Sequence, residues 1–174
     1  DNFNVVKVDV RQTETMQNII KDKDIIIPLA AFVGAPLCNF DPVGAKTTNY
    51  DSIVSLLNNK SKNQIILMPT TNSAYGSGDE NNFCTEESSL NPISQYAKDK
   101  VDVENILMQH ENVISFRLAT VFGMSPRMRL DLLVNDFTFR ACKDNFLILF
   151  ESNFKRNYIH VRDVVNAFMH SLNN

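Results

Sequence analysis

Short apolar runs alternate along the chain with segments in which apolar residues recur at helical spacing. The apolar runs cover residues 4–9, 24–31, 65–68 and 113–118. The helical patterns cover residues 13–21, 41–59 and 94–109. Continuous apolar runs of this length are typical of strands that are buried on both faces, as in parallel sheets. Strands that alternate with helices across short connections predict a parallel α/β sheet joined by right-handed crossovers.

Two of the predicted helices begin at residues suited to a helix start. Asp41 can cap the second helix, and Pro42 follows it in the first turn, where a missing N–H costs nothing. Ser94, after Asn91-Pro92, can cap the third helix. Gly34 and Pro36 predict a loop before Asp41. Near the end of the sequence, one further helix is predicted over 130–142 and one further strand over 146–150.

A polar segment follows the apolar run at 65–68. Residues 69–76 carry hydroxyl and amide side chains, and a polar loop over 77–91 leads to the helix that begins after Ser94. Open α/β sheets bind their ligands just past the carboxyl ends of their strands. We therefore expect the chemistry of this protein at that turn.

Composition narrows the class of protein. The 174 residues, 44% of them hydrophobic, suffice for one domain with a core, and a net charge of −3 without basic clusters argues against a nucleic-acid partner. Cys38, Cys84 and Cys142 are too widely spaced to indicate a zinc site or a disulfide framework, so no metal is expected. Neither a membrane-spanning run nor a signal segment is found, which predicts a cytoplasmic protein without a membrane partner.

A phenol and an ammonium share one stripe of the helix predicted over 94–109. Tyr96, Lys100, Val103 and Leu107 recur at the spacing of one helix face, the face that otherwise looks inward. One interpretation is that Lys100 lowers the pKa of Tyr96, so that the phenol serves as acid and base near neutral pH. The other is a half-exposed helical pair without a catalytic role.

Five motifs together decide between these interpretations. In chain order they are Leu29-Ala30-Ala31 after a strand, Thr71 four residues before Tyr75-Gly76, Tyr96-x-x-x-Lys100, Arg117 at a strand end, and the run from Arg156 to Asp163. In this order the chain resembles the extended short-chain dehydrogenase/reductases, specifically the nucleotide-sugar epimerases and dehydratases related to UDP-glucose 4-epimerase. The resemblance implies a partial Rossmann-like, doubly wound parallel sheet over 1–123. It also implies part of a smaller substrate-binding lobe over 124–154 and a returning segment over 155–174.

The same resemblance implies NAD as cofactor, with NADP not distinguished. Asp9 and Val10 would lie against the adenine, and the backbone of Leu29, Ala30 and Ala31 along the cofactor. Asn49, Tyr96 and Lys100 match further cofactor positions, and Lys100 would hold the nicotinamide ribose. Simpler interpretations stay open: Ala30 and Ala31 as tight packing residues, Asp9 as a turn former, and Asn49 as a solvent-facing helical residue.

A nucleoside diphosphate sugar is the substrate that the resemblance implies. Tyr96 would be the acid–base residue, and Thr71 would hydrogen-bond the reacting oxygen. Thr120, which replaces the usual Asn, together with Asn135 and Arg156 would contact the substrate, and a guanidinium suits its diphosphate. Arg127 and Arg129 form either a diphosphate contact or a solvated basic loop. His160 and Asp163 are expected to form a structural strand-to-helix turn.

Departures from the family separate several hypotheses. No G-x-x-G-x-x-G motif occurs, and the chain begins at what resembles the third Rossmann strand, which indicates a fragment or a remnant without cofactor binding. For the full-length protein we expect an NAD-dependent nucleotide-sugar epimerase, working as a homodimer. The alternatives are a ketoreductase of the same family and a non-catalytic Rossmann remnant. Dehydratases carry Asp and Glu after the active-site Thr, whereas this chain has Asn72 and Ser73, which argues against a dehydratase.

Overall fold

The computed structural model describes residues 3–77, 83–150 and 152–173, which fall into two compact units, Asp1–Arg117 and Leu118–Asn174. The three-part division at residues 123 and 154 that the sequence suggests stays a prediction.

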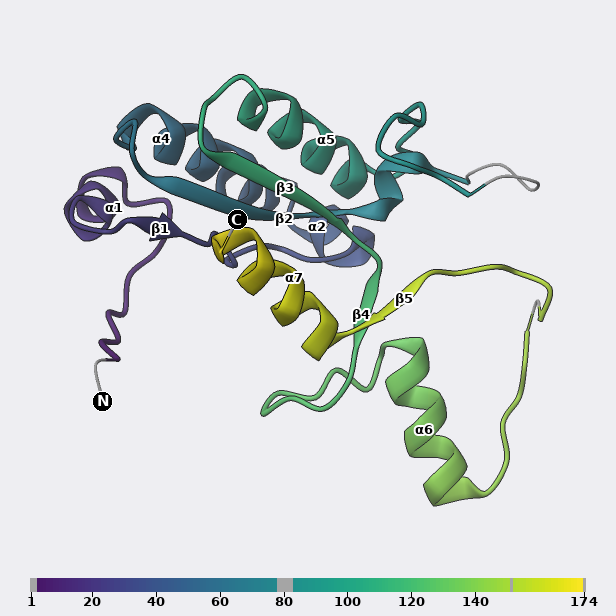
Figure 1. Ribbon diagram of the computed structural model, residues 1–174. Coiled ribbons are helices and arrows are strands. Elements are labelled where there is room, and N and C mark those ends of the chain that lie inside the picture. Colours follow the sequence, from purple (N-terminus) through teal and green to yellow (C-terminus); the bar gives the residue numbers. More distant parts are fainter. Residues whose placement is uncertain (1–2, 78–82, 151, 174) are drawn as a thin grey trace. The chain divides into compact units, whose positions relative to one another are not determined.

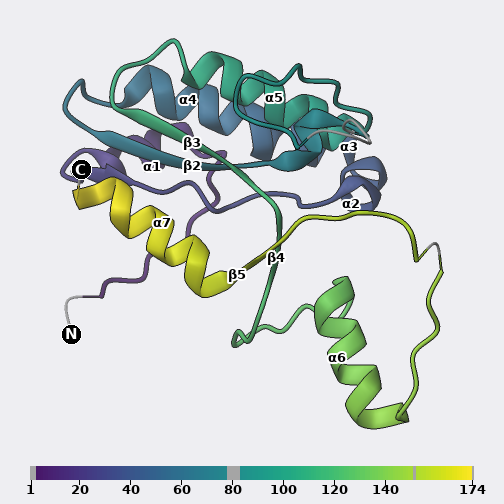
Figure 2. The same ribbon diagram turned by 45° about the vertical axis from the view of Figure 1, so that its right-hand side comes forward.

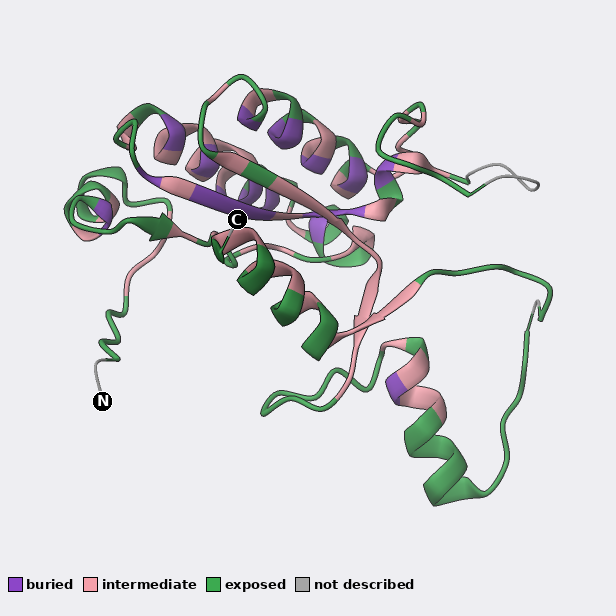
Figure 3. Cartoon of the chain, viewed as in Figure 1, coloured by how far each residue is buried: buried purple, intermediate pink, exposed green. Residues whose placement is uncertain are grey.

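A parallel sheet forms the centre of the first unit. Its strands are β1 (Ile25–Ile26), β2 (Ile65–Thr71) and β3 (Val113–Leu118), in the order β1-β2-β3. β1 runs parallel to β2, with Ile25 opposite Ile65. Figure 3 shows β2 as the most buried strand, and Ile66 and Leu67 are 0% exposed. The parallel α/β architecture predicted from the sequence is confirmed.

Helices connect these strands and cover the sheet. They are α1 (Thr13–Ile20), α2 (Ala35–Phe40), α3 (Pro42–Lys46), the π-helical turn η1 (Thr47–Asp51), α4 (Ser52–Asn59), the 3-10 turn η2 (Asn72–Tyr75) and α5 (Gln95–Leu107). Figures 1 and 2 both show α4 and α5 along one face of β2 and β3. Ile53 and Leu57 of α4, Ile66 and Met68 of β2, and Val103 and Leu107 of α5 form the core between these layers.

Both predicted helix caps are confirmed. The Asp41 carboxylate accepts a hydrogen bond from the Gly44 N–H at 2.8 Å, and the Ser94 hydroxyl accepts one from the Ala97 N–H at 3.2 Å. These caps satisfy N–H groups that have no partner inside a helix. Ser94 thereby fixes the start of the helix that carries Tyr96 and Lys100.

The second unit pairs two short parallel strands. β4 (Thr120–Phe122) lies beside β5 (Tyr158–His160), and α7 (Val161–Asn173) begins directly after β5. His160 Nδ1 accepts a hydrogen bond from the Arg162 N–H at 3.2 Å, and its ring meets Phe122 edge-on. The expected structural role of His160 in a strand-to-helix turn is confirmed. The helix predicted over 130–142 is α6 (Leu133–Asp144).

Four predictions of secondary structure are wrong. Residues 4–9 and 146–150 are not strands, and Val5 and Phe150 are 77% and 84% exposed. A strand needs a neighbour for its backbone hydrogen bonds, and an apolar run alone does not supply one. The predicted strand over 24–31 is regular only at Ile25–Ile26, and the predicted loop at Gly34 and Pro36 contains α2, with Pro36 in its first turn.

Candidate active site

The stripe predicted on α5 faces inward. Lys100 is 5% exposed, Val103 and Leu107 are at most 1% exposed, and Tyr96 at the start of the helix is half-buried. An amphipathic helix usually keeps lysine on its solvent side, because a buried ammonium loses its hydration. The burial of Lys100 therefore makes the folded state less stable than it would be with this ammonium exposed to water.

Asn49 binds the backbone of the segment that follows β1. This residue lies in the π-helical turn and is 1% exposed, so the solvent-facing interpretation is wrong. Its side-chain oxygen accepts the Phe32 N–H at 2.8 Å, and its amide nitrogen donates to the Phe32 carbonyl at 2.9 Å. The backbone that follows Ala30 and Ala31 is thus fixed by one side chain from the next helical segment.

Cys38 of α2 completes this environment. It is 3% exposed, and its sulfur lies 3.9 Å from the Asn49 amide nitrogen and 3.5 Å from the Phe32 carbonyl. Burial raises the pKa of the Cys38 thiol; the charge of Asp99 adds to the rise, and the charge of Lys100 opposes it. The thiol and the Asn49 amide therefore share one buried region.

The two candidate catalytic groups titrate in ways that burial explains. Burial raises the pKa of the Tyr96 phenol, with a further rise from Cys38. Burial lowers the pKa of the Lys100 ammonium, and Cys38 offsets only part of this effect. The expected lowering of the Tyr96 pKa by Lys100 is wrong for this chain by itself, because desolvation disfavours the phenolate and the ammonium alike.

Thr71 ends β2 and begins the turn that follows. Its side chain is buried, and its hydroxyl oxygen accepts the Ser73 N–H at 3.2 Å. The strand therefore continues three residues beyond Met68, where the apolar run ends. Thr71 stands at the carboxyl end of the central strand, the location at which α/β sheets carry their ligands.

A clamp closes the loop that follows this turn. The Asn91 N–H donates to the Ala74 carbonyl at 2.9 Å. Gly76 has a φ of +67°, and a Cβ there would lie 2.2 Å from the Asn91 carbonyl oxygen. Only glycine fits this approach of two backbone segments. The two ends of the loop over 77–90 are thus joined at its base.

A buried ion pair, which sequence analysis missed, joins α5 to the sheet. Glu104 of α5 is 6% exposed, and Arg117 of β3 donates to its Oε1 atom from Nε at 2.8 Å and from Nη2 at 2.5 Å. Thr70 and Ser115 approach the Oε2 atom at 3.0 and 2.8 Å. The available signal was an acidic residue four positions after Lys100, on the same inward stripe.

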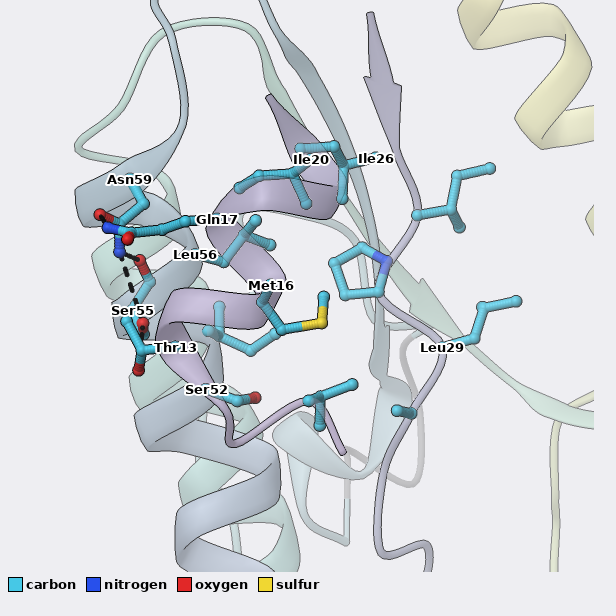
Figure 4. Close-up of a pocket in the computed structure, with 15 residues that line it drawn as sticks. Thr13, Met16, Gln17, Ile20, Ile26, Leu29, Ser52, Ser55, Leu56 and Asn59 are labelled. Atoms are coloured by element: carbon cyan, nitrogen blue, oxygen red, sulfur yellow. Dashed lines mark hydrogen bonds between the residues drawn. The ribbon is translucent and has the colours of Figure 1, made fainter. Parts of the chain in front are cut away.

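Two hollows lie where the cofactor residues were predicted. Figure 4 shows one of them, a cavity of about 270 Å³ with Met16, Ile20, Ile26, Leu29 and Leu56 around it. Val10 and Ala30 line both this cavity and an adjoining groove, and Asp9 lines the groove. Hydrogen bonds from the Arg11 side chain and N–H hold the pKa of Asp9 at about 2. The structure thus brings Asp9, Val10, Leu29 and Ala30 together.

Three of the predicted substrate residues, Thr120, Asn135 and Arg156, lie in the second unit, whereas Thr71 lies in the first. The Thr120 N–H donates to the Asn157 carbonyl at 3.2 Å, and Arg156 is exposed. Asn135 is 6% exposed, accepts the Gly123 N–H at 3.2 Å and donates to the Arg129 carbonyl at 3.0 Å. Arg129 itself pairs with Asp131 at 2.5 Å. Asn135 therefore organises the loop after β4 through both atoms of its amide.

The sequence as a whole matches one protein family. The family model described as "NAD dependent epimerase/dehydratase family" matches residues 1–174. The chain belongs to this family. The solved structures that resemble this chain include a UDP-glucose 4-epimerase and a UDP-N-acetylglucosamine 4-epimerase. Within the described ranges, no helix is long and apolar enough to cross a membrane, and no group of His, Cys, Asp and Glu could hold a metal ion.

Individual relatives are distant and longer. An uncharacterised protein of Schizosaccharomyces pombe is 29% identical over a match covering 56% of this chain and 31% of that protein. The UDP-glucose 4-epimerase of Thermotoga maritima, solved with UDP-glucose, is 24% identical with a TM-score of 0.80, covering 94% of this chain and 57% of that one. The dTDP-glucose 4,6-dehydratase of Bacillus anthracis, solved with NAD, is 24% identical with a TM-score of 0.80. That match covers 97% of this chain and 54% of the dehydratase. The chain thus spans about half the length of these solved relatives and shares their fold.

Proposed function

We propose that this protein is an NAD-dependent epimerase of a nucleotide sugar, with its catalytic groups at Tyr96, Lys100 and Thr71. The observation that carries this proposal is the burial of the Lys100 ammonium on the same helix face as Tyr96. A buried lysine is unfavourable for folding and is expected where a ligand or a reaction uses it. Membership of an NAD-dependent family supplies the reaction class.

The residues of this chain fit two parts of NAD. The apolar cavity and its groove, with Val10, Ala30 and Asp9, suit an adenosine group. Lys100 suits the ribose next to the nicotinamide, because an ammonium donates up to three hydrogen bonds. Asn49 would keep the Phe32 backbone clear of the cofactor path. Reversible hydride transfer is the chemistry that NAD supplies when bound.

The chemical work of this chain is proton transfer and orientation. Tyr96 would take the proton of the sugar hydroxyl during oxidation and give it back during reduction. Burial raises the pKa of Tyr96 and so favours the neutral phenol, which means that its use as a base would require positive charge close to the phenol oxygen. Thr71 would hold the reacting oxygen. Thr120, Asn135 and Arg156 would contact the nucleoside diphosphate, with Arg156 donating to its phosphates.

The test is turnover by the full-length protein with NAD and a panel of UDP- and dTDP-sugars. We expect interconversion of two epimers without net change in NADH absorbance. Net formation of NADH together with a keto-sugar product would instead assign a ketoreductase, observed in its oxidising direction. A 4-keto-6-deoxy product would assign a dehydratase, against the amide and hydroxyl of Asn72 and Ser73.

A second candidate is a non-catalytic Rossmann remnant, favoured by the lack of a glycine-rich phosphate-binding motif in these 174 residues. Without such a turn, the diphosphate loses backbone donors and a helix N-terminus, and NAD should bind weakly. Calorimetry of the 174-residue chain with NAD tests this. A micromolar dissociation constant would exclude the remnant.

A further inference from the structure

We propose that Glu104 is a positioning residue that sets the Tyr96–Lys100 helix against the strand end carrying Thr71. The inference rests on the proposed function, because it concerns the alignment of the same three groups. Glu104 lies one helical turn beyond Lys100, and its carboxylate accepts hydrogen bonds from Thr70, Ser115 and Arg117.

Glu104 connects α5 to two strands of the sheet. Its carboxylate accepts hydrogen bonds from the hydroxyl of Thr70 in β2 at 3.0 Å and from the hydroxyl of Ser115 in β3 at 2.8 Å. It also accepts hydrogen bonds from two N–H groups of Arg117. The side chains of Glu104 and Arg117 are 8% and 20% exposed. Charge-assisted hydrogen bonds with these directions allow little sliding or rotation of the helix, because several bonds would have to break together.

The residue of β2 that Glu104 binds, Thr70, is the neighbour of Thr71 in the sequence. Thr70 directly precedes it, and consecutive Cα atoms are about 3.8 Å apart, so holding Thr70 holds Thr71. Along α5, Tyr96 is eight residues from Glu104, about 12 Å at 1.5 Å per residue. A helix of this length is stiff, and a shift at Glu104 therefore moves the Tyr96 phenol by a similar amount.

Arg117, the partner of Glu104, also binds residues that follow Thr71 in the sequence. Its Nη1 atom donates to the Tyr75 hydroxyl at 2.9 Å and to the Glu86 carbonyl at 3.1 Å. Its guanidinium also lies over the Tyr75 ring, 5.3 Å from the centroid. Tyr75 ends the 3-10 turn that begins after Thr71. Glu104 and Arg117 thus fix the residues on both sides of Thr71.

A purely stabilising ion pair is the competing explanation, and the two differ in kinetics. A misplacement of about 1 Å between catalytic groups can lower the rate by about 10²-fold. A stabilising pair would lower the melting temperature while leaving the turnover of folded molecules unchanged.

The experiment uses full-length enzyme and compares Glu104→Gln, Thr71→Val and the double variant. We expect Glu104→Gln to lower kcat by about 10²-fold with KM within about threefold. In the Thr71→Val background its effect should shrink to about threefold or less, because alignment with an absent hydroxyl no longer matters. Glu111→Gln, an exposed residue just after the helix, is the matched control and should keep normal turnover.

A milder pair of variants covers the case in which Glu104→Gln does not fold. Thr70→Val removes one hydroxyl from the carboxylate and should lower kcat by about tenfold, whereas Thr70→Ser keeps the hydroxyl and should restore it. Unchanged kcat in Thr70→Val and Glu104→Gln, or equal effects with and without Thr71, would overturn the positioning role alone. No turnover by wild-type enzyme with any nucleotide sugar would overturn the proposed function as well, so the two failures are distinguishable.

Discussion

The side-chain amide of Asn49 holds both backbone polar groups of Phe32, at 2.8 and 2.9 Å, across 17 positions of sequence. This pairing does for the segment after β1 what a neighbouring strand would otherwise do. It leaves neither the N–H nor the carbonyl of Phe32 without a partner in a partly buried place.

Asn49→Ala should therefore destabilise the protein by about 2–4 kcal/mol, because two backbone groups lose their hydrogen bonds and a small cavity forms. Urea denaturation followed by circular dichroism measures this loss. Asn39→Ala, at an exposed position of α2, is the control and should change stability by less than about 0.5 kcal/mol. Equal effects of the two substitutions would show that the Phe32 backbone does not depend on Asn49.

Tyr96→Phe should lower kcat of the full-length enzyme by about 10²–10⁴-fold and leave the melting temperature nearly unchanged. The ring still packs, and only the phenol oxygen is removed from a half-buried side chain. The loss should fall on kcat more than on KM. Tyr50→Phe, on the neighbouring π-helical turn, is the matched control. Near-normal turnover with a lower melting temperature would make Tyr96 a packing residue.

Lys100→Met should raise stability and reduce function. Because the folded-state pKa of Lys100 lies below its ordinary value of 10.5, the folded state disfavours the charged form. The cost of burying the ammonium is present at neutral pH and is relieved as the pH rises through the lowered pKa towards 10.5. We expect a gain of about 1 kcal/mol at pH 7 together with weaker NAD binding.

Thermal unfolding between pH 7 and pH 10 and NAD titration calorimetry of full-length protein measure the two effects of Lys100→Met. Lys98→Met, two residues away on the exposed side, should change neither quantity. A destabilised Lys100→Met variant at neutral pH would mean that the ammonium has a stabilising partner.

The Glu104 pair should make stability depend on pH in the acid range. Burial alone would raise the pKa of this carboxyl, but hydrogen bonds from Arg117, Ser115 and Thr70 hold it below its ordinary value of 4.5. The stabilisation is therefore fully present above about pH 5 and is lost as the pH falls through the lowered pKa.

Comparison of wild type with Glu104→Gln across pH 3–7 tests this. The difference in unfolding free energy should be about 3 kcal/mol at neutral pH and should shrink below pH 4.5. A difference that stays constant throughout this range would show that the ion pair does not set the pKa.

Local signals predicted more of this structure than long-range ones. The caps at Asp41 and Ser94 were predictable because each bonds within three residues. The inward stripe of Tyr96 and Lys100 followed from helical spacing alone. The strand predicted at residues 146–150 failed because pairing depends on a distant partner that an apolar run does not specify.

In the candidate site, too, local sequence signals were informative and long-range contacts were not foreseen. Residue types and order along the sequence indicated Tyr96, Lys100 and Thr71, whose roles stay predictions. The Glu104 network was not foreseen, because Thr70 lies 34 positions away and its Thr-Glu contact exists only once α5 has packed on the sheet. The raised pKa of Tyr96 could not be foreseen either, since it depends on burial and on Cys38 of a separate helix.

The clamp between Ala74, Gly76 and Asn91 has an evolutionary consequence. Because the loop leaves and re-enters the fold at one joined base, its entropy of closure varies only slowly with its length. The joined base itself therefore holds the Thr71 side and the Ser94 side of the loop at a fixed separation. Gly76 is therefore the residue of this segment that descendants of the chain must retain, because a side chain there would meet the Asn91 carbonyl.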